Sequence, residues 1–96
     1  MSKDEVLETL RSLHGQIEEE YKARIEGIFG SRARGEDHAE SDLDVLVDFQ
    51  EKATLYDLVG LADFLESILQ CKVDVVSKRA LRDEIAPDVL RDLVRL

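Results

Sequence analysis

The segment from Asp42 to Phe49, with the sequence DLDVLVDF, constrains the fold more than any other part of the chain. Its nearly continuous apolar run is typical of a strand that is buried in a sheet. Side chains two residues apart in a strand point to the same face, so Asp42 and Asp44 present both carboxylates on one side. Leu43 and Val45 then face the core. Carboxylates at the start of a buried strand are costly unless a bound group compensates for their charge.

Hydrophobic periodicity predicts the remaining elements, and a capping box at Ser2 and Glu5 predicts where the first helix begins. In chain order we expect a helix over residues 3–22, strands over 24–30 and 41–49, and a helix over 55–69 that Thr54 caps. A strand over 72–77 follows, and then two short helical segments within residues 78–96, the last with Pro87 in its first turn. This order predicts an α/β (α+β) fold. A small mixed sheet of three to four strands would carry helices packed on it, within a single domain over residues 1–96.

A third carboxylate, Asp74, stands in the apolar strand that we expect over residues 72–77. If this strand lies next to the one that carries Asp42 and Asp44, three carboxylates meet on one face and raise each other's pKa by repulsion. A divalent cation removes that repulsion, and hard oxygen ligands select Mg²⁺ or Mn²⁺. Two such ions, about 3.5–4 Å apart, would suit an in-line displacement at phosphorus.

Gly30 and Ser31 supply the second half of the candidate site. They end an expected strand and precede what we interpret as a helical turn, with the sequence SRAR. The first residues of a helical turn offer free backbone N–H groups and a positive dipole end, which suit phosphate. Glycine lets a triphosphate approach the backbone closely, and the serine can add a hydroxyl. Arg32 and Arg34 are near enough to contact either phosphate or a partner.

Particular residues exclude two rival motifs. Gly30 and Gly35 have the glycine spacing of a P-loop, but acidic residues 36 and 37 follow where Lys-Ser/Thr is required. An EF-hand loop needs an oxygen ligand where Leu46 stands.

Other polar and aromatic residues have simpler interpretations. We expect the following residues to be structural or solvated and to have no part in catalysis: His14, His38, Asp48, Cys71 and the acidic runs 18–20 and 36–41. Asp48 would be a solvated charge at the far end of its strand, and Cys71 a small apolar residue. We expect Tyr21 and Tyr56 to pack against other side chains.

Charge and composition limit the possible partners. The net charge is −9 over 96 residues, which disfavours nucleic acid because phosphate binding needs clustered Lys and Arg. The lone Cys71 cannot form an internal disulfide and fits a reducing compartment. No apolar run approaches the length of a membrane span, and the first residues are charged. We therefore expect a cytoplasmic protein that does not contact membranes.

The spacing of Gly30-Ser31, ten residues, Asp42-Leu43-Asp44 and a later strand with Asp74 resembles the nucleotidyltransferase signature of the DNA polymerase β-like superfamily. The longer text GSRARGE…SDLDVLVDF is similar to the minimal nucleotidyltransferases (MNT proteins), and the resemblance covers nearly the whole chain. It implies that Asp42 and Asp44 bind two metal ions, Mg²⁺ or Mn²⁺. Asp74 would complete the metal site and help to deprotonate the acceptor. Gly30 and Ser31 would hold the triphosphate of ATP or another NTP.

The resemblance also implies a reaction and a partner. The enzyme would transfer a nucleoside monophosphate, AMP in our expectation, to a hydroxyl and release pyrophosphate. Many MNT proteins are antitoxins of a HEPN-type toxin, and some transfer AMP to a tyrosine of that toxin. We therefore expect a hetero-oligomer with a cognate HEPN-type toxin. Two alternatives stay open: an MNT-fold antitoxin that neutralises its toxin by binding alone, and a catalytic subunit that modifies a small molecule with the help of a helical partner.

Overall fold

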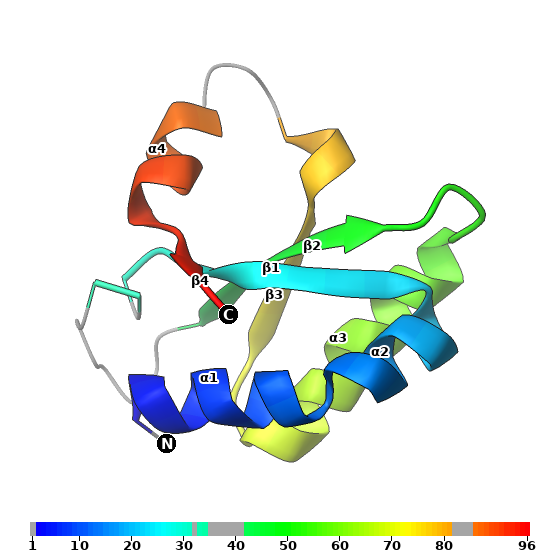
Figure 1. Ribbon diagram of the computed structural model, residues 1–96, viewed down its shortest axis with the longest axis horizontal. Helices are drawn as coiled ribbons and strands as arrows, with labels where there is room; N and C mark the ends of the chain where they lie inside the picture. The colour runs from blue at the N-terminus through cyan, green and yellow to red at the C-terminus, as the bar shows by residue number, and fades with distance from the viewer. Residues whose placement is uncertain (1, 32, 35–41, 82–85) are drawn as a thin grey trace.

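A small mixed sheet forms the centre of the protein. The computed structural model describes residues 2–31, 33–34, 42–81 and 86–96. In chain order, the elements are α1 (Lys3–Ser12), α2 (His14–Tyr21), β1 (Ala23–Phe29), β2 (Leu43–Phe49), α3 (Leu55–Leu69), β3 (Val73–Ser77), the short 3-10 helix η1 (Lys78–Ala80), α4 (Ala86–Asp92) and β4 (Val94–Arg95). The strand order is β3-β2-β1-β4. Helices α1, α2 and α3 lie on one side of the sheet and α4 lies on the other (Figure 1). None of the helices in these ranges is long and apolar enough to cross a membrane.

The sheet combines both kinds of strand pairing. β1 and β2 pair antiparallel, whereas β2 and β3 pair parallel, from Leu43 opposite Val73 to Val47 opposite Ser77. Parallel neighbours need a crossover connection, and α3 supplies it. The predicted α/β fold class with a small mixed sheet is therefore confirmed.

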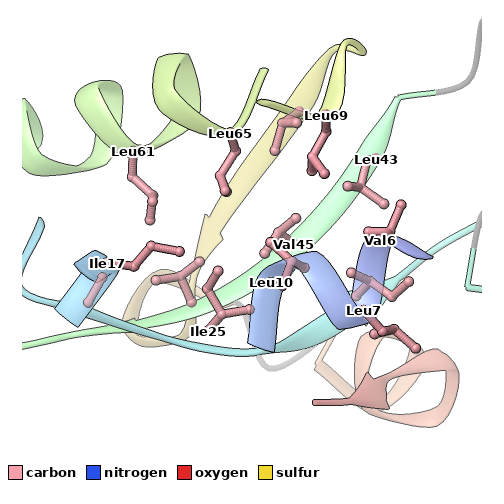
Figure 2. Packing of buried hydrophobic residues seen from close by; sticks show 14 of the residues in the cluster. Val6, Leu7, Leu10, Ile17, Ile25, Leu43, Val45, Leu61, Leu65 and Leu69 are labelled. Carbon is pink, nitrogen blue, oxygen red and sulfur yellow. The ribbon is translucent and has the colours of Figure 1, made fainter. Parts of the chain in front are cut away.

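One hydrophobic cluster fills the space between the sheet and the helices α1, α2 and α3 (Figure 2). Leu61 and Leu65 lie one turn apart on α3, Leu10 comes from α1, and Val45 and Val47 come from β2; none of the five has exposed surface. Burying an aliphatic side chain of this size contributes roughly 1.5–3 kcal/mol. The period-two pattern of β2 and the helical pattern of α3 meet in this cluster, which holds β2 at the middle of the sheet.

Both predicted helix starts carry their caps. The Glu5 backbone N–H donates to the Ser2 hydroxyl at 3.2 Å, and the Ser2 N–H donates to the Glu5 carboxylate at the same distance. At the start of α3, the Thr54 backbone N–H donates to the Asp57 carboxylate at 2.9 Å. Because these backbone bonds favour the ionised form, the pKa of Glu5 and the pKa of Asp57 lie below their ordinary values.

The single helix predicted over residues 3–22 was wrong, because two helices occupy this range. Leu13 separates α1 from α2, at φ −95° and ψ 0°. The Ser12 hydroxyl donates to the Thr9 carbonyl oxygen at 2.7 Å, a local bond that competes with helical pairing. Gly15 lies two residues after Leu13, and glycine is a weak helix former. Local backbone chemistry therefore interrupts an apolar pattern that continues through the break.

The tail contains a strand that the sequence did not predict. η1 and α4 match the two expected helical segments, with Pro87 in the first turn of α4. Val94 and Arg95 then form β4, which pairs antiparallel with Ile28 and Gly27 of β1. A strand of two residues is too short to show a period, so no pattern in the sequence marks it.

The two tyrosines differ in their environment. Tyr21 packs as predicted, with its ring centroid 5.4 Å from that of Phe64. The prediction that Tyr56 packs was wrong, because Tyr56 is 90% exposed. It lies in the first turn of α3, out of phase with Leu61 and Leu65, which face the sheet. Helical phase, and not aromatic character, decides its burial.

Replacing Gly27 with alanine should detach β4 from the sheet. A Cβ atom at Gly27 would collide with the carbonyl oxygen of Val94 and lie 3.0 Å from the Arg95 Cα. The backbone of β4 would have to move, at the cost of about 1–3 kcal/mol that is typical of overpacking. Amide hydrogen exchange measures the result, because the Leu96 N–H that donates to the Glu26 carbonyl oxygen at 3.3 Å would lose protection.

Gly15→Ala is the matched control. A Cβ atom at Gly15 would meet no heavy atom within 4 Å, so alanine should stabilise α2 by up to about 1 kcal/mol. Unchanged exchange of the Leu96 amide in Gly27→Ala would contradict the close approach of β4.

Candidate nucleotidyl-transfer site

Two aspartates lie side by side where β2 and β3 begin. Asp44 is directly opposite Asp74 in the parallel ladder, so both carboxylates project from one face of the sheet. The opposite face carries the core, in which Leu43 and Val45 are fully buried. Neighbouring strands are roughly 4.8 Å apart, so the two carboxylates are close enough to repel each other. The two acidic strands are therefore neighbours, as the sequence analysis required for a shared site.

Burial and like charge both act on Asp44. Its side chain is half-buried, and the loss of hydration raises the pKa of its carboxyl above the ordinary value. The carboxylates of Asp74 and Asp42 raise the pKa of Asp44 further. Asp42 lies directly before β2 and is half-buried, whereas Asp74 is exposed. A positive charge bound beside Asp44 would relieve this repulsion.

Gly30 lies against Asp44. It follows the last residue of β1, Phe29, which is opposite Asp44 in the antiparallel ladder. Its φ of +78° falls in the left-handed region, which favours glycine. A Cβ atom at Gly30 would collide with a carboxylate oxygen of Asp44 and lie 3.3 Å from its Cγ. Glycine is thus needed for two reasons, and the turn that was predicted to bind phosphate adjoins the acidic pair.

The segment after Gly30 begins with one helical turn. The Arg34 backbone N–H donates to the Gly30 carbonyl oxygen at 3.2 Å, which closes this turn. Ser31 is half-buried in this turn, and Ala33 is buried in the core. Arg34 also donates to the Asp92 carboxylate of α4 at 2.6 Å, so it ties the turn to α4. Arg32, the acidic run 36–41 and His38 lie outside the described residues.

The donor set fits a divalent cation that substrate phosphates complete. Among the described residues, no group of three His, Cys, Asp or Glu side chains is arranged as a ready-made metal cage. Mg²⁺ does not need such a cage, because it usually takes one or two carboxylates together with phosphate oxygens and water. Asp44 and Asp74 supply carboxylate oxygens of the required type on one exposed face, next to a turn that suits phosphate.

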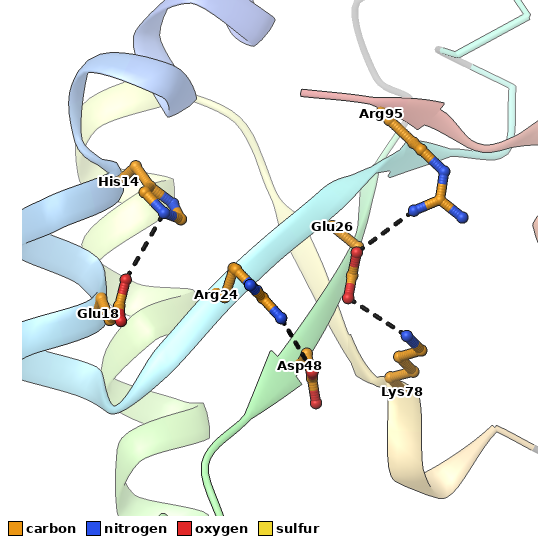
Figure 3. A network of polar contacts seen from close by, with 7 residues as sticks. All are labelled: His14, Glu18, Arg24, Glu26, Asp48, Lys78 and Arg95. Carbon is orange, nitrogen blue, oxygen red and sulfur yellow. Dashed lines mark hydrogen bonds and ion pairs between the residues drawn. The ribbon is translucent and has the colours of Figure 1, made fainter.

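Asp48 has a long contact with Arg24, so the prediction that Asp48 is only a solvated charge was incomplete. It shares the face of Asp44 at the other end of β2, and its carboxylate is 3.9 Å from the Arg24 guanidinium on β1 (Figure 3). Leu46, between Asp44 and Asp48, is 1% exposed. This buried leucine separates the acidic pair from the charged end of the same face.

Sequence reasoning missed Glu26. It is the extra residue of a bulge in β1, between Ile25 and Gly27. Its carboxylate accepts hydrogen bonds from Lys78 at 3.3 Å and from Arg95 at 3.4 Å (Figure 3). The bulge shifts the alternation of β1, so no regular pattern assigns Glu26 to a face. It links η1, β1 and β4 across the sheet.

The remaining polar residues match their simple interpretations. His14 Nε2 lies 3.6 Å from the Glu18 carboxylate, one turn along α2. Glu18, Glu19 and Glu20 are exposed, and Cys71 is half-buried between α3 and β3. None of these residues contributes to the acidic pair.

Three comparisons place this geometry among known proteins. A family model described as the nucleotidyltransferase domain matches residues 3–96. Protein adenylyltransferase MntA of Thermococcus cleftensis is 40% identical over 91 residues, which cover 94% of this chain and 92% of that protein. A solved structure described as a candidate minimal nucleotidyltransferase is 39% identical, with a TM-score of 0.77, and the match covers 100% of this chain and 97% of that one. A crystal structure described as a toxin-antitoxin with AMP-PNP is 23% identical with a TM-score of 0.71, over 99% of this chain and 72% of that one, and shows likeness of fold alone.

These matches confirm the nucleotidyltransferase fold that Gly30-Ser31 and Asp42-Leu43-Asp44 predicted. The family model spans almost the entire chain, and the identity to a curated enzyme is high over most of both lengths. The chain therefore belongs to the nucleotidyltransferase domain family, and it is an enzyme of the minimal nucleotidyltransferase type.

Proposed function

We propose that this nucleotidyltransferase uses Mg²⁺ or Mn²⁺ to transfer AMP from ATP to a hydroxyl of a partner protein, and that it thereby acts as an antitoxin in the cytoplasm. One arrangement carries the proposal: Gly30 packs against Asp44, and Asp44 is opposite Asp74. A phosphate-binding turn and the carboxylates for the cations would therefore serve the same bound nucleotide.

The residues would divide the work of the transfer. Asp42, Asp44 and Asp74 would hold two divalent ions, which when bound neutralise charge on the phosphates. Gly30 and Ser31 would orient the triphosphate through backbone N–H groups and the serine hydroxyl. The exposed carboxylate of Asp74 would accept the proton of the acceptor hydroxyl. The acceptor oxygen bonds to the α-phosphorus, the bond from that phosphorus to the α,β-bridging oxygen breaks, and pyrophosphate leaves.

Size and relatives support a protein acceptor. A sheet of four strands, of which one has two residues, leaves little material for an acceptor pocket, so the acceptor would bring its own surface. The 40%-identical relative is named a protein adenylyltransferase. The structurally similar crystal structure is described as a toxin-antitoxin with AMP-PNP. We propose a HEPN-type toxin as the partner in a hetero-oligomer, and a tyrosine of that toxin as the acceptor.

A second function, neutralisation by binding alone, is favoured by the surface of α3. Leu55 is 72% exposed, Tyr56 90% and Val59 49%, all in the first two turns. Adjoining exposed apolar side chains are common where another protein binds. Occlusion would not need the aspartates or the Gly-Ser turn, so their presence favours the enzymatic function.

ATP binding should require both the cation and the aspartates. Calorimetry should detect ATP binding in Mg²⁺ or Mn²⁺ and none after chelation, because the triphosphate would otherwise face uncompensated carboxylates. In Asp42→Asn/Asp44→Asn we expect the affinity to fall by more than about tenfold.

Two controls make this result interpretable. Asp63→Asn, at an exposed position of α3, should bind ATP as the wild type does. The double variant should melt no lower than the wild type without metal, because it removes like charges near Asp74. Equal ATP affinity in the double variant and the wild type would rule out this site.

Gly30→Ala should abolish nucleotide transfer, and Ser31→Ala should lower it without loss of stability. Alanine at Gly30 has to adopt a left-handed backbone, which costs roughly 1–2 kcal/mol, and its Cβ displaces the Asp44 carboxylate. Ser31→Ala removes only the hydroxyl and leaves the backbone N–H in place. Thermal melting and an assay for pyrophosphate release separate the effects. If Ser31→Ala unfolds the protein instead, Ser31 is structural and does not bind phosphate.

The proposed acceptor is tested by intact mass spectrometry of the partner. The protein, Mg²⁺ and each NTP in turn are incubated with the product of the neighbouring gene. We expect a mass increase of one or more AMP units with ATP, and no increase with Asp44→Ala. Absence of added mass with every NTP, together with full neutralisation of the toxin by Asp44→Ala, would favour binding alone.

A further inference from the structure

The turn that begins at Gly30 is fastened to α4 by an ion pair. The Arg34 backbone N–H donates to the Gly30 carbonyl oxygen at 3.2 Å and closes the turn. The side chain of the same residue reaches α4, where Nη1 of Arg34 donates to Oδ2 of Asp92 at 2.6 Å. Arg34 therefore connects the backbone of the turn to a residue that lies 58 positions later in the chain.

The part of the chain that carries Asp92 is held on both sides. Before it, Val89 of α4 is buried. After it, Val94 lies opposite Ile28 in the ladder of β4 with β1. In Figure 1, β4 follows α4 directly and lies beside β1. The Asp92 carboxylate is therefore presented to the turn from a fixed position.

The place of Asp92 in α4 indicates that its carboxylate does not serve the helix. Asp92 is the last residue of α4, and the C-terminal end of a helix carries partial negative charge. A carboxylate is unfavourable there, whereas Asp88 in the first turn of the same helix is favourable. The ion pair with Arg34 offsets this unfavourable position, and it leads to the turn and not to another residue of α4.

The turn has little freedom to move at its other end, where it packs against Asp44. Gly30 has a φ of +78°, and a Cβ atom there would collide with a carboxylate oxygen of Asp44. One aspartate thus adjoins the first residue of the turn, and Asp92 binds the side chain of Arg34 four residues later. A misplacement of about 1 Å in a group that positions substrate can lower a rate on the order of a hundredfold.

We propose that Asp92 is a positioning residue for nucleotide binding. Through Arg34, it holds the turn in the conformation that presents backbone N–H groups to the phosphates of the nucleotide. This role rests on the proposed function and adds to it a residue from outside the acidic pair and the Gly-Ser motif. Arg34 acts through its backbone link to Gly30 and not by contact with phosphate.

The test is calorimetry with ATP and Mg²⁺ on Asp92→Asn, which keeps the size of the side chain and removes its charge. We expect the affinity for ATP to fall about fivefold, the loss typical of one ion pair. The variant should not weaken α4, because it removes a negative charge from the C-terminal end of the helix. Asp92→Glu keeps the carboxylate and should keep most of the wild-type affinity.

Asp88→Asn is the matched control. The Asp88 carboxylate accepts from Arg91 at 2.6 Å, the same distance as in the pair of Asp92, but both partners belong to α4. Its loss would therefore disturb the helix without touching the turn. This variant should bind ATP as the wild type does.

Amide hydrogen exchange without nucleotide tests the anchor independently of the proposed function. In Asp92→Asn, the Arg34 amide should lose protection, because the turn that it closes is no longer held. The Leu96 amide, which donates to the Glu26 carbonyl oxygen at 3.3 Å, should stay protected and show that β4 is still paired. Asp88→Asn should change neither amide.

A double-mutant cycle tests whether Asp92 acts through Arg34. Arg34→Gln should weaken ATP binding about as much as Asp92→Asn does. The double variant should bind no more weakly than either single variant, because both changes remove the same contact. A further loss in the double variant would overturn the proposed role and would assign Arg34 to the phosphates directly.

Three other results would also overturn the role of Asp92. They are wild-type ATP affinity in Asp92→Asn, unchanged protection of the Arg34 amide in that variant, and an equal loss of affinity in Asp88→Asn, which would show only that α4 had been disturbed. These results leave the proposed function in place. Absence of ATP binding by the wild-type protein, in contrast, would contradict the proposed function and, with it, the role of Asp92.

Discussion

The parallel pairing of β2 with β3 is the contact on which the rest of the structure depends. It places Asp44 opposite Asp74, with both carboxylates on the face of the sheet that is turned away from the core. The other neighbour of β2 is β1, which ends beside Asp44, so Gly30 adjoins the acidic pair without any further element. Helix α3 makes this possible, because it is the crossover that lets two acidic strands run in the same direction.

The hydrophobic core compensates for the repulsion that this pairing creates. Leu43 and Val45 are fully buried on the face opposite Asp44, in the same cluster as Leu65 of α3 (Figure 2). Each such side chain contributes roughly 1.5–3 kcal/mol, whereas carboxylates that keep part of their hydration repel one another more weakly. The fold can therefore hold like charges together before any ligand binds. A divalent cation bound as proposed would relieve the repulsion between these carboxylates.

Charged residues of β1 and β4 form a second polar cluster, in which basic side chains predominate. Glu26 occupies a bulge and binds both Lys78 and Arg95, so it fixes η1 and β4 relative to β1. β4 is short, and it pairs with β1 at Gly27 and Ile28. This acidic protein thus carries arginine side chains around the start of β1, whereas Asp44 of β2 lies opposite the last residue of β1, with Asp74 of β3 beside it.

Local sequence patterns determined most of the helices and strands of this protein, because side-chain burial and backbone preference act over a few residues. The apolar run after Asp42, the parity of Asp44 and Asp74, the capping boxes and the phase of α3 could all be read from the sequence, and they predicted the fold class and the candidate site residues. Two departures from the predictions were also local in origin: the break near Ser12 interrupts a helix whose apolar period continues, and the phase of α3 exposes Tyr56. Tertiary structure decided what depends on contacts between distant segments. Strand β4 exists only because Gly27 admits the backbone of Val94. The contact of Gly30 with Asp44 and the ion pairs of Glu26 follow from strand register. Register is a relation between segments, so no single stretch of the sequence contains it.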